Sequence, residues 1–93
     1  MFSLAQNGSV LTERDLGAKI RSELLSIISA EHKVTVDLSN VQMVTSSFAD
    51  ELFAKLIEEI GPEAKSKVAI VNVSTTVRTI INEAIFTRSK LPQ

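Results

Sequence analysis

The fold of this chain is decided by one stretch, Val34-Thr-Val-Asp-Leu-Ser-Asn-Val-Gln-Met-Val-Thr-Ser-Ser-Phe-Ala-Asp-Glu-Leu-Phe53. Its first residues alternate between apolar and polar side chains, which is the pattern of a strand with one face better buried than the other. After a short loop, the serine pair Ser46-Ser47 opens a segment whose apolar residues recur at helical spacing. The stretch therefore predicts a strand, a loop and a helix that begins with two hydroxyl side chains.

The residues before this stretch predict a hairpin followed by a helix. Asn7-Gly8 favours a two-residue turn between Phe2–Gln6 and Ser9–Thr12. Thr12-Glu-Arg-Asp15 resembles a capping box. Apolar residues follow it at helical spacing and predict a helix that fades near Ala30.

The residues after the stretch predict one more strand and one more helix. Gly61-Pro62 ends the second helix, because Gly favours a left-handed turn and Pro cannot continue the hydrogen-bond ladder. Val68-Ala-Ile-Val-Asn-Val73 is a nearly continuous apolar run and predicts a central strand. Ser74 is placed to cap a third helix, and the polar tail, residues 87–93, is expected to fray.

This order of elements predicts an α/β fold. Strands separated by helix-length segments imply parallel crossovers. Each predicted helix carries one apolar stripe and therefore needs one packing surface. A two-layer sandwich, with a small mixed sheet and helices mainly on one face, meets both conditions. Residues 1–93 are expected to form a single domain, because either half alone would bury too small a core.

Composition excludes several classes of function. The net charge of −1, with scattered Lys and Arg, argues against nucleic-acid binding, which needs clustered positive charge. The chain has no cysteine and hence no disulfide or Cys-based metal site. It shows neither a signal peptide nor an apolar run of membrane-spanning length. We therefore expect a cytoplasmic protein without a nucleic-acid or membrane partner.

The same stretch carries a family resemblance. A hydrophobic strand, then Asp37-Leu-Ser-Asn-Val41, then a serine pair that opens a helix resembles the STAS fold of anti-sigma-factor antagonists. The chain is more similar to the STAS-like family of unknown function, whose members share its run Ser47-Phe-Ala-Asp-Glu-Leu-Phe53. Two further segments look similar to that family, Leu11–Gly17 and Val71–Val77.

The resemblance implies a phosphorylation site and a partner. In the antagonists, a partner kinase phosphorylates a serine at the start of this helix and so releases or prevents binding. By motif position the counterpart is Ser47, with Ser46 as the neighbouring hydroxyl. Thr45 stands where the antagonists have Asp, and Phe48 where they have Gly. The implied partner is a histidine-kinase-like ATPase or a regulator associated with one.

Two interpretations of Ser47 stay open, and they are compatible. The structural one is an N-cap, in which Ser47-Phe-Ala-Asp50 forms a capping box worth about 1 kcal/mol. The functional one is a phosphorylated switch. A phosphate at a helix N-terminus is locally favourable, but Asp50 and Glu51 would repel it. We expect such a phosphate to alter a docking surface rather than to unfold the domain.

A partner-binding surface is expected around this helix start. Its predicted residues are Thr45, Ser46, Ser47, Phe48, Asp50 and Glu51. Phe48 is also a core candidate. Glu51 and Lys55, one turn apart, are expected to pair on a solvated face.

The remaining polar residues predict neither an enzyme nor a cofactor. His32 is the single histidine and is expected at the surface rather than as a metal ligand. Arg78 and Arg88 are expected to be solvated charges. The chain has no Gly-rich phosphate loop and no Ser with a matched His and acid.

The sequence thus predicts a non-enzymatic interaction module of bacterial-type signalling, resembling anti-sigma-factor antagonists and switched at Ser47. Two alternatives stay open. One is a homo-oligomeric adaptor, for example a homodimer, without phosphorylation. The other is a nucleotide- or phosphate-sensing domain that uses the helix start near Ser46 and Ser47.

Overall fold

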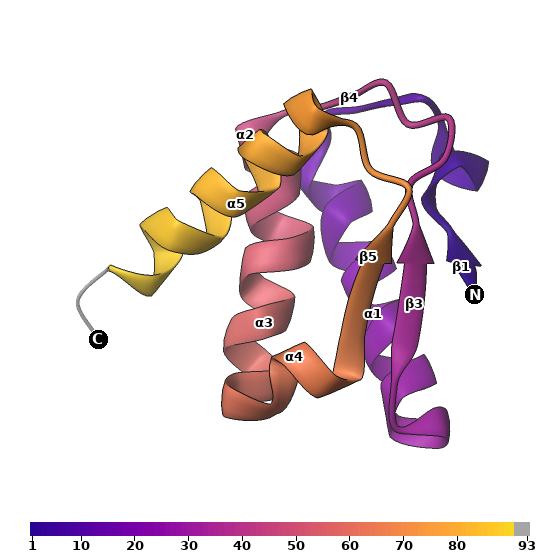
Figure 1. The fold of residues 1–93 in the computed structure, drawn as a ribbon, viewed down its shortest axis with the longest axis vertical. Coiled ribbons are helices and arrows are strands. Elements are labelled where there is room, and N and C mark those ends of the chain that lie inside the picture. Colours follow the sequence, from indigo (N-terminus) through magenta and orange to yellow (C-terminus); the bar gives the residue numbers. More distant parts are fainter. Residues whose placement is uncertain (91–93) are drawn as a thin grey trace.

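Short strands alternate with helices along residues 1–90, the part of the chain that the computed structural model describes (Figure 1). The strands are β1 Phe2–Ser3, β2 Val10–Leu11, β3 Val34–Asp37, β4 Met43–Val44 and β5 Val68–Val71. The α-helices are α1 Arg14–Glu31, α2 Ser46–Ala49, α3 Lys55–Ile60, α4 Ala64–Lys67 and α5 Thr75–Ser89. The 3-10 turns are η1 Leu4–Asn7 and η3 Gly61–Glu63, and a π-helical turn, η2 Asp50–Ala54, joins α2 to α3.

The strands form two small sheets in which every described pair is parallel. The larger sheet has the order β1-β3-β5, and β2 pairs with β4 in the smaller one. In the larger sheet Val36 lies opposite Phe2 on one side and Ile70 on the other. Figure 1 shows the helices α1 and α3 on one side of this sheet. The predicted α/β fold is confirmed, with a parallel rather than a mixed sheet.

The predicted hairpin at Asn7-Gly8 is wrong. Asn7 ends the turn η1, and the Gly8 N–H donates to the Ala5 carbonyl at 2.9 Å while Gly8 takes φ 123°. The strands on either side belong to different sheets, because β3 and β4 offer each of them a parallel partner. The Asn-Gly pair therefore closes a local turn that carries the chain from one sheet to the other.

Strand β5 lies at the edge of its sheet, and the prediction of a central strand is wrong. The central strand is β3, with Val34 and Val36 buried. In β5, Ala69 is exposed and the other three residues are only half-buried. A continuous apolar run therefore does not by itself distinguish a central strand from an edge strand.

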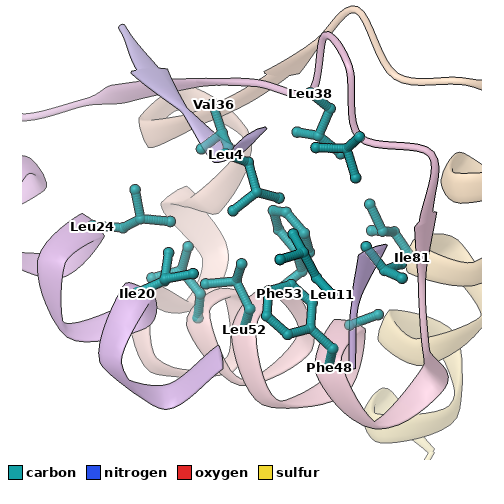
Figure 2. Close-up of a cluster of buried hydrophobic side chains, with 14 of the residues drawn as sticks. Leu4, Leu11, Ile20, Leu24, Val36, Leu38, Phe48, Leu52, Phe53 and Ile81 are labelled. Carbon is teal, nitrogen blue, oxygen red and sulfur yellow. The ribbon is translucent and has the colours of Figure 1, made fainter. Parts of the chain in front are cut away.

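The helical run 46–60 packs on more than one side. Its turn η2 contacts both α1 and α5, and α1 also contacts β3. Phe48, Leu52 and Phe53 are fully buried there. Figure 2 shows them in one cluster with Leu4, Leu11, Ile20, Leu24, Val36, Leu38 and Ile81. The prediction that each helix needs only one packing surface is therefore wrong for this helix, which lies at the centre of the core.

Most predicted helix ends are confirmed, and two predictions are wrong. Gly61 ends α3 with φ 83°, and the Ser74 hydroxyl accepts the Val77 N–H at 3.2 Å. The capping box predicted at Thr12 is absent, because α1 begins at Arg14 after an N-cap without a side-chain bond. Helix α5 continues to Ser89, so fraying from residue 87 is wrong for residues 87–89. Residues 91–93 lie outside the described residues.

Candidate functional site

The helix that carries the serine pair is capped by Thr45. Its hydroxyl oxygen accepts the Phe48 N–H at 3.2 Å, and the same hydroxyl donates to the Thr12 carbonyl at 3.2 Å. Helix α2 therefore begins at Ser46, and Ser47 is its second residue. The capping box predicted from Ser47 to Asp50 is wrong, because Ser47 lies inside the helix and the Asp50 N–H bonds to the backbone carbonyls of Ser46 and Ser47.

Since Thr45 is the cap, the hydroxyls of Ser46 and Ser47 are left exposed. Within residues 1–90, neither hydroxyl takes part in a side-chain hydrogen bond. Both line an open surface hollow of about 330 Å³ between the start of α2 and the end of α5. The other lining residues are Arg14, Asp50, Glu83, Ala84, Thr87 and Arg88.

An ion pair between Asp50 and Arg88 borders this hollow. The Arg88 guanidinium holds both carboxylate oxygens of Asp50, with Nε–Oδ1 at 2.7 Å and Nη2–Oδ2 at 2.8 Å. Arg14 adds a third contact to Oδ2 at 3.2 Å. The Arg88 guanidinium lowers the pKa of Asp50 below its ordinary value. This bidentate pair fastens the last turn of α5 to the helix that carries the serines.

Glu51, the next residue, is the one buried charged side chain among those described. Its carboxylate contacts Arg21 at 2.8 Å, Arg14 at 3.0 Å, and Lys55 at 3.0 and 3.1 Å. Hydrogen bonds, first from Arg21 and then from Lys55, lower the pKa of Glu51 from 4.5 to about 2. The predicted Glu51–Lys55 pair is confirmed, but the solvated face is wrong because these cations bury the carboxylate against α1.

The turn η2 also leaves a backbone carbonyl, that of Glu51, available to the Arg21 side chain. The Lys55 N–H donates to the carbonyls of Asp50 and Leu52 but not to the carbonyl of Glu51. The Arg21 guanidinium donates to that Glu51 carbonyl instead. Single π-helical turns of this kind occur often at functional sites. Here the turn allows adjacent acidic residues to meet different cations, Asp50 with Arg88 and Glu51 with Arg21.

Two residues predicted to contact a partner are unavailable for it. Phe48 has no exposed surface and Glu51 has 8%. Both predictions are wrong, because the helix is covered on several sides rather than one. The exposed members of the predicted surface are Ser46 and Ser47, with Thr45 and Asp50 half-buried beside them.

The structure adds an exposed apolar pair that the sequence reasoning missed. Val10 in β2 and Met43 in β4 are paired across the smaller sheet. They expose 57% and 40% of their surface. Met43 precedes the cap Thr45 by two residues and Ser46 by three. The sequence shows Val10 and Met43 only as two separate apolar residues next to polar ones. The parallel pairing of β2 with β4 brings them together.

The structure also revises the role of Arg88. The prediction of a solvated charge is wrong, because Arg88 binds Asp50 and lies 3.5 Å from Glu58. No sequence pattern relates residues 38 positions apart in this way. Arg78 and His32 are exposed, as predicted.

Comparison with known families gives the chain its place. A family model described as a STAS-like domain of unknown function matches residues 17–78. The chain belongs to this family. The STAS-like match includes the serine pair and Glu51, whereas Arg14 and Arg88 lie outside the matched residues. Comparisons with curated proteins and with solved structures found no match.

Residues 1–90 of the STAS-like domain lack two kinds of feature. Among residues 1–90, no three His, Cys, Asp or Glu side chains are grouped in a way that could hold a metal ion. None of the helices in these residues has the length and apolar content that a membrane crossing requires.

The capping assignment makes a direct prediction. We expect Thr45→Ala to lower the free energy of unfolding by about 1 kcal/mol, because the Phe48 N–H loses its acceptor. Ser47→Ala should change it by less than about 0.5 kcal/mol, since the hydroxyl of Ser47 is exposed. Urea unfolding of both variants measures the difference, and Thr45→Ser, which keeps the hydroxyl, is the control. A larger loss in Ser47→Ala than in Thr45→Ala would contradict the assignment.

Proposed function

We propose that this STAS-like domain is a non-enzymatic interaction module of bacterial-type signalling. It docks a partner protein at the surface around Ser46 and Ser47, and phosphorylation of Ser47 switches that docking. The partner class is a histidine-kinase-like ATPase, or a regulator associated with one. The module works in the cytoplasm, without a cofactor and without contact to nucleic acid or membrane.

One observation carries this proposal: Thr45 caps the helix, so both serine hydroxyls are free at the surface. Modification of either serine therefore leaves the capping bond from the Phe48 N–H to Thr45 in place. Met43, three residues before Ser46, and its strand partner Val10 expose apolar area of the kind found at interface centres. A charge added at Ser47 would change this surface without entering the core.

The phosphorylation step of the proposed switch is a transfer of one phosphoryl group to the Ser47 hydroxyl. A bond forms between the Ser47 oxygen and the terminal phosphorus of a nucleoside triphosphate. The bond from that phosphorus to the diphosphate breaks, and the hydroxyl proton passes to a base of the kinase. The product carries a charge of about −2 at neutral pH. The kinase supplies the base and the nucleotide, so this chain needs only an accessible hydroxyl.

Affinity capture from the lysate of the native host tests the proposal. Wild type, Ser47→Glu and Ser29→Glu serve as baits, and mass spectrometry identifies the retained proteins. Ser29 is an exposed residue of α1, roughly 22 Å along the helix from Arg14, so it adds the same charge away from the hollow. We expect wild type and Ser29→Glu to retain a kinase-like ATPase or its regulator, and Ser47→Glu to lose it. Binding of the purified partner then confirms direct contact.

Other outcomes of this experiment contradict the proposal. Equal capture of the same ATPase by all three baits removes Ser47 as a switch. Capture of this chain alone would favour the homo-oligomeric adaptor. The apolar edge strand β5 supports that alternative, because it has no described partner on its outer side and could pair with a second copy.

A further inference from the structure

Arg14 can leave the acidic cluster without isolating a carboxylate. It contacts Asp50 and Glu51 through one nitrogen, Nη1, at 3.2 and 3.0 Å. If it turns away, Asp50 keeps the bidentate contact of Arg88. Glu51 keeps Arg21 and Lys55. Arg14 is therefore dispensable for the charge balance of both carboxylates.

The other arginines of the cluster are held more firmly. Departure of Arg88 would break two short bonds to Asp50 and also its 3.5 Å contact with Glu58. Departure of Arg21 would break its contacts with Glu51 and with Glu59. Their side chains are 21% and 17% exposed, whereas that of Arg14 is 50% exposed. Arg14 thus has both the freedom and the solvent access to take a new partner.

Arg14 also lines the hollow into which the serine hydroxyls open. Ser47 precedes Asp50 by three residues, so the two side chains lie on neighbouring positions of one helix face. A phosphate on Ser47 would therefore lie beside the carboxylate that Arg14 contacts at present. A dianion with three acceptor oxygens is a stronger partner for a guanidinium than an oxygen already shared with Arg88.

We infer that Arg14 is the residue that receives the phosphate of phosphorylated Ser47, turning away from Asp50 and Glu51 while Arg88 remains on Asp50. This inference rests on the proposed function, because it takes Ser47 as the modified hydroxyl. It adds a named regulatory contact between α2 and the start of α1. The phosphate would be held against the domain, so the partner meets a neutralised arginine and a bulky group instead of free hydroxyls.

Phosphoserine installed at position 47 of the full chain by genetic encoding tests the inference without any kinase. Phosphorus NMR measures the second pKa of the phosphate, which is about 6 in an unconstrained phosphoserine. A bound guanidinium favours the dianion and lowers that value, whereas the nearby carboxylates of Asp50 and Glu83 raise it. We expect Arg14→Ala to raise the phosphate pKa by at least about half a unit relative to the unsubstituted phosphoprotein, roughly a threefold change in proton affinity.

Controls make the result specific to Arg14. Lys19→Ala, which removes an exposed cation five residues further along α1, should leave the phosphate pKa unchanged. Arg14→Lys should give an intermediate value, because an ammonium binds phosphate as a point charge. In unmodified protein, millimolar inorganic phosphate should leave the NMR signal of the Arg14 Nε–H group in place.

Three outcomes would overturn the inference. One is an unchanged phosphate pKa in Arg14→Ala. Another is a larger rise in Arg88→Lys, which would assign the phosphate to Arg88. The third is a saturable response of Arg14 to inorganic phosphate, which would indicate a site for the free anion. None of these results depends on partner capture, so a failure of this inference can be told apart from a failure of the proposed docking function.

Discussion

Replacing Glu51 by Gln is expected to lower the free energy of unfolding by about 3 kcal/mol, the low end of the cost of breaking a buried ion pair. Gln keeps the size of the side chain but removes the charge that three cations share. The unpaired charge is most costly at Arg21, because its side chain is only 17% exposed to water. Lys55 and Arg14 can turn toward water, which keeps the loss near the low end.

Urea unfolding at neutral pH measures this loss. Glu59→Gln is the matched control, because Glu59 also pairs with Arg21, at 3.2 Å, but its side chain is 47% exposed. An exposed pair of this kind contributes about 0.5 kcal/mol or less. Equal losses in the two variants would show that burial of the Glu51 carboxylate adds nothing to its stabilising effect.

Acid unfolding provides a second readout of the same variant. The folded pKa of Glu51, about 2, lies below its ordinary value of 4.5. A depressed folded pKa means that the stabilisation is present above the ordinary value and is lost as pH falls toward the folded one. Wild type should therefore lose more stability between about pH 5 and pH 2 than Glu51→Gln does. Parallel curves would contradict the assigned cause.

Replacing Gly17 by Leu is expected to cost about 3 kcal/mol, the upper part of the range for overpacking a core. Gly17 lies where α1 crosses the central helix. A Cβ there would lie 3.2 Å from the Glu51 Cβ and 3.4 Å from the Phe48 carbonyl oxygen. A backbone carbonyl cannot move aside as a flexible side chain can. A Leu therefore has to separate the two helices.

Two companion variants separate packing from helix propensity. In Gly17→Ala, a crowding of a few tenths of an ångström opposes a gain in helix propensity of about 1 kcal/mol, so the net change should stay below about 1 kcal/mol. Ser22→Leu adds a Leu at an exposed position of the same helix and should change stability by less than about 0.5 kcal/mol. A Gly17→Leu variant as stable as Ser22→Leu would show that the helix crossing tolerates a large side chain.

Local patterns were reliable for the type of each long element. The helical spacing in α1, the alternation in β3 and the caps at Gly61 and Ser74 all have the predicted structure. These signals depend on side-chain periodicity and backbone preferences, which act within a few residues. The hairpin at Asn7-Gly8 failed because each of its arms found a parallel partner strand much further along the chain.

The candidate site was only partly accessible to sequence reasoning. Thr45, Ser46 and Ser47 are three successive hydroxyl residues, each able to cap a helix. Local rules could not choose among them. Thr45 is the cap in the structure, and its hydroxyl also donates to the Thr12 carbonyl, 33 residues away in sequence. That distant contact favours Thr45 and leaves the serines free.

The sequence by itself determined the α/β class, the strand and helix at residues 34–53, the serine pair at the helix start and the family of the chain. Only the tertiary structure decided that Glu51 is buried among cations, that Arg88 holds Asp50 and that Arg14 borders the serines. The reason is physical. Periodicity is set by neighbours along the chain, whereas ion pairs and burial depend on which helices the core brings together.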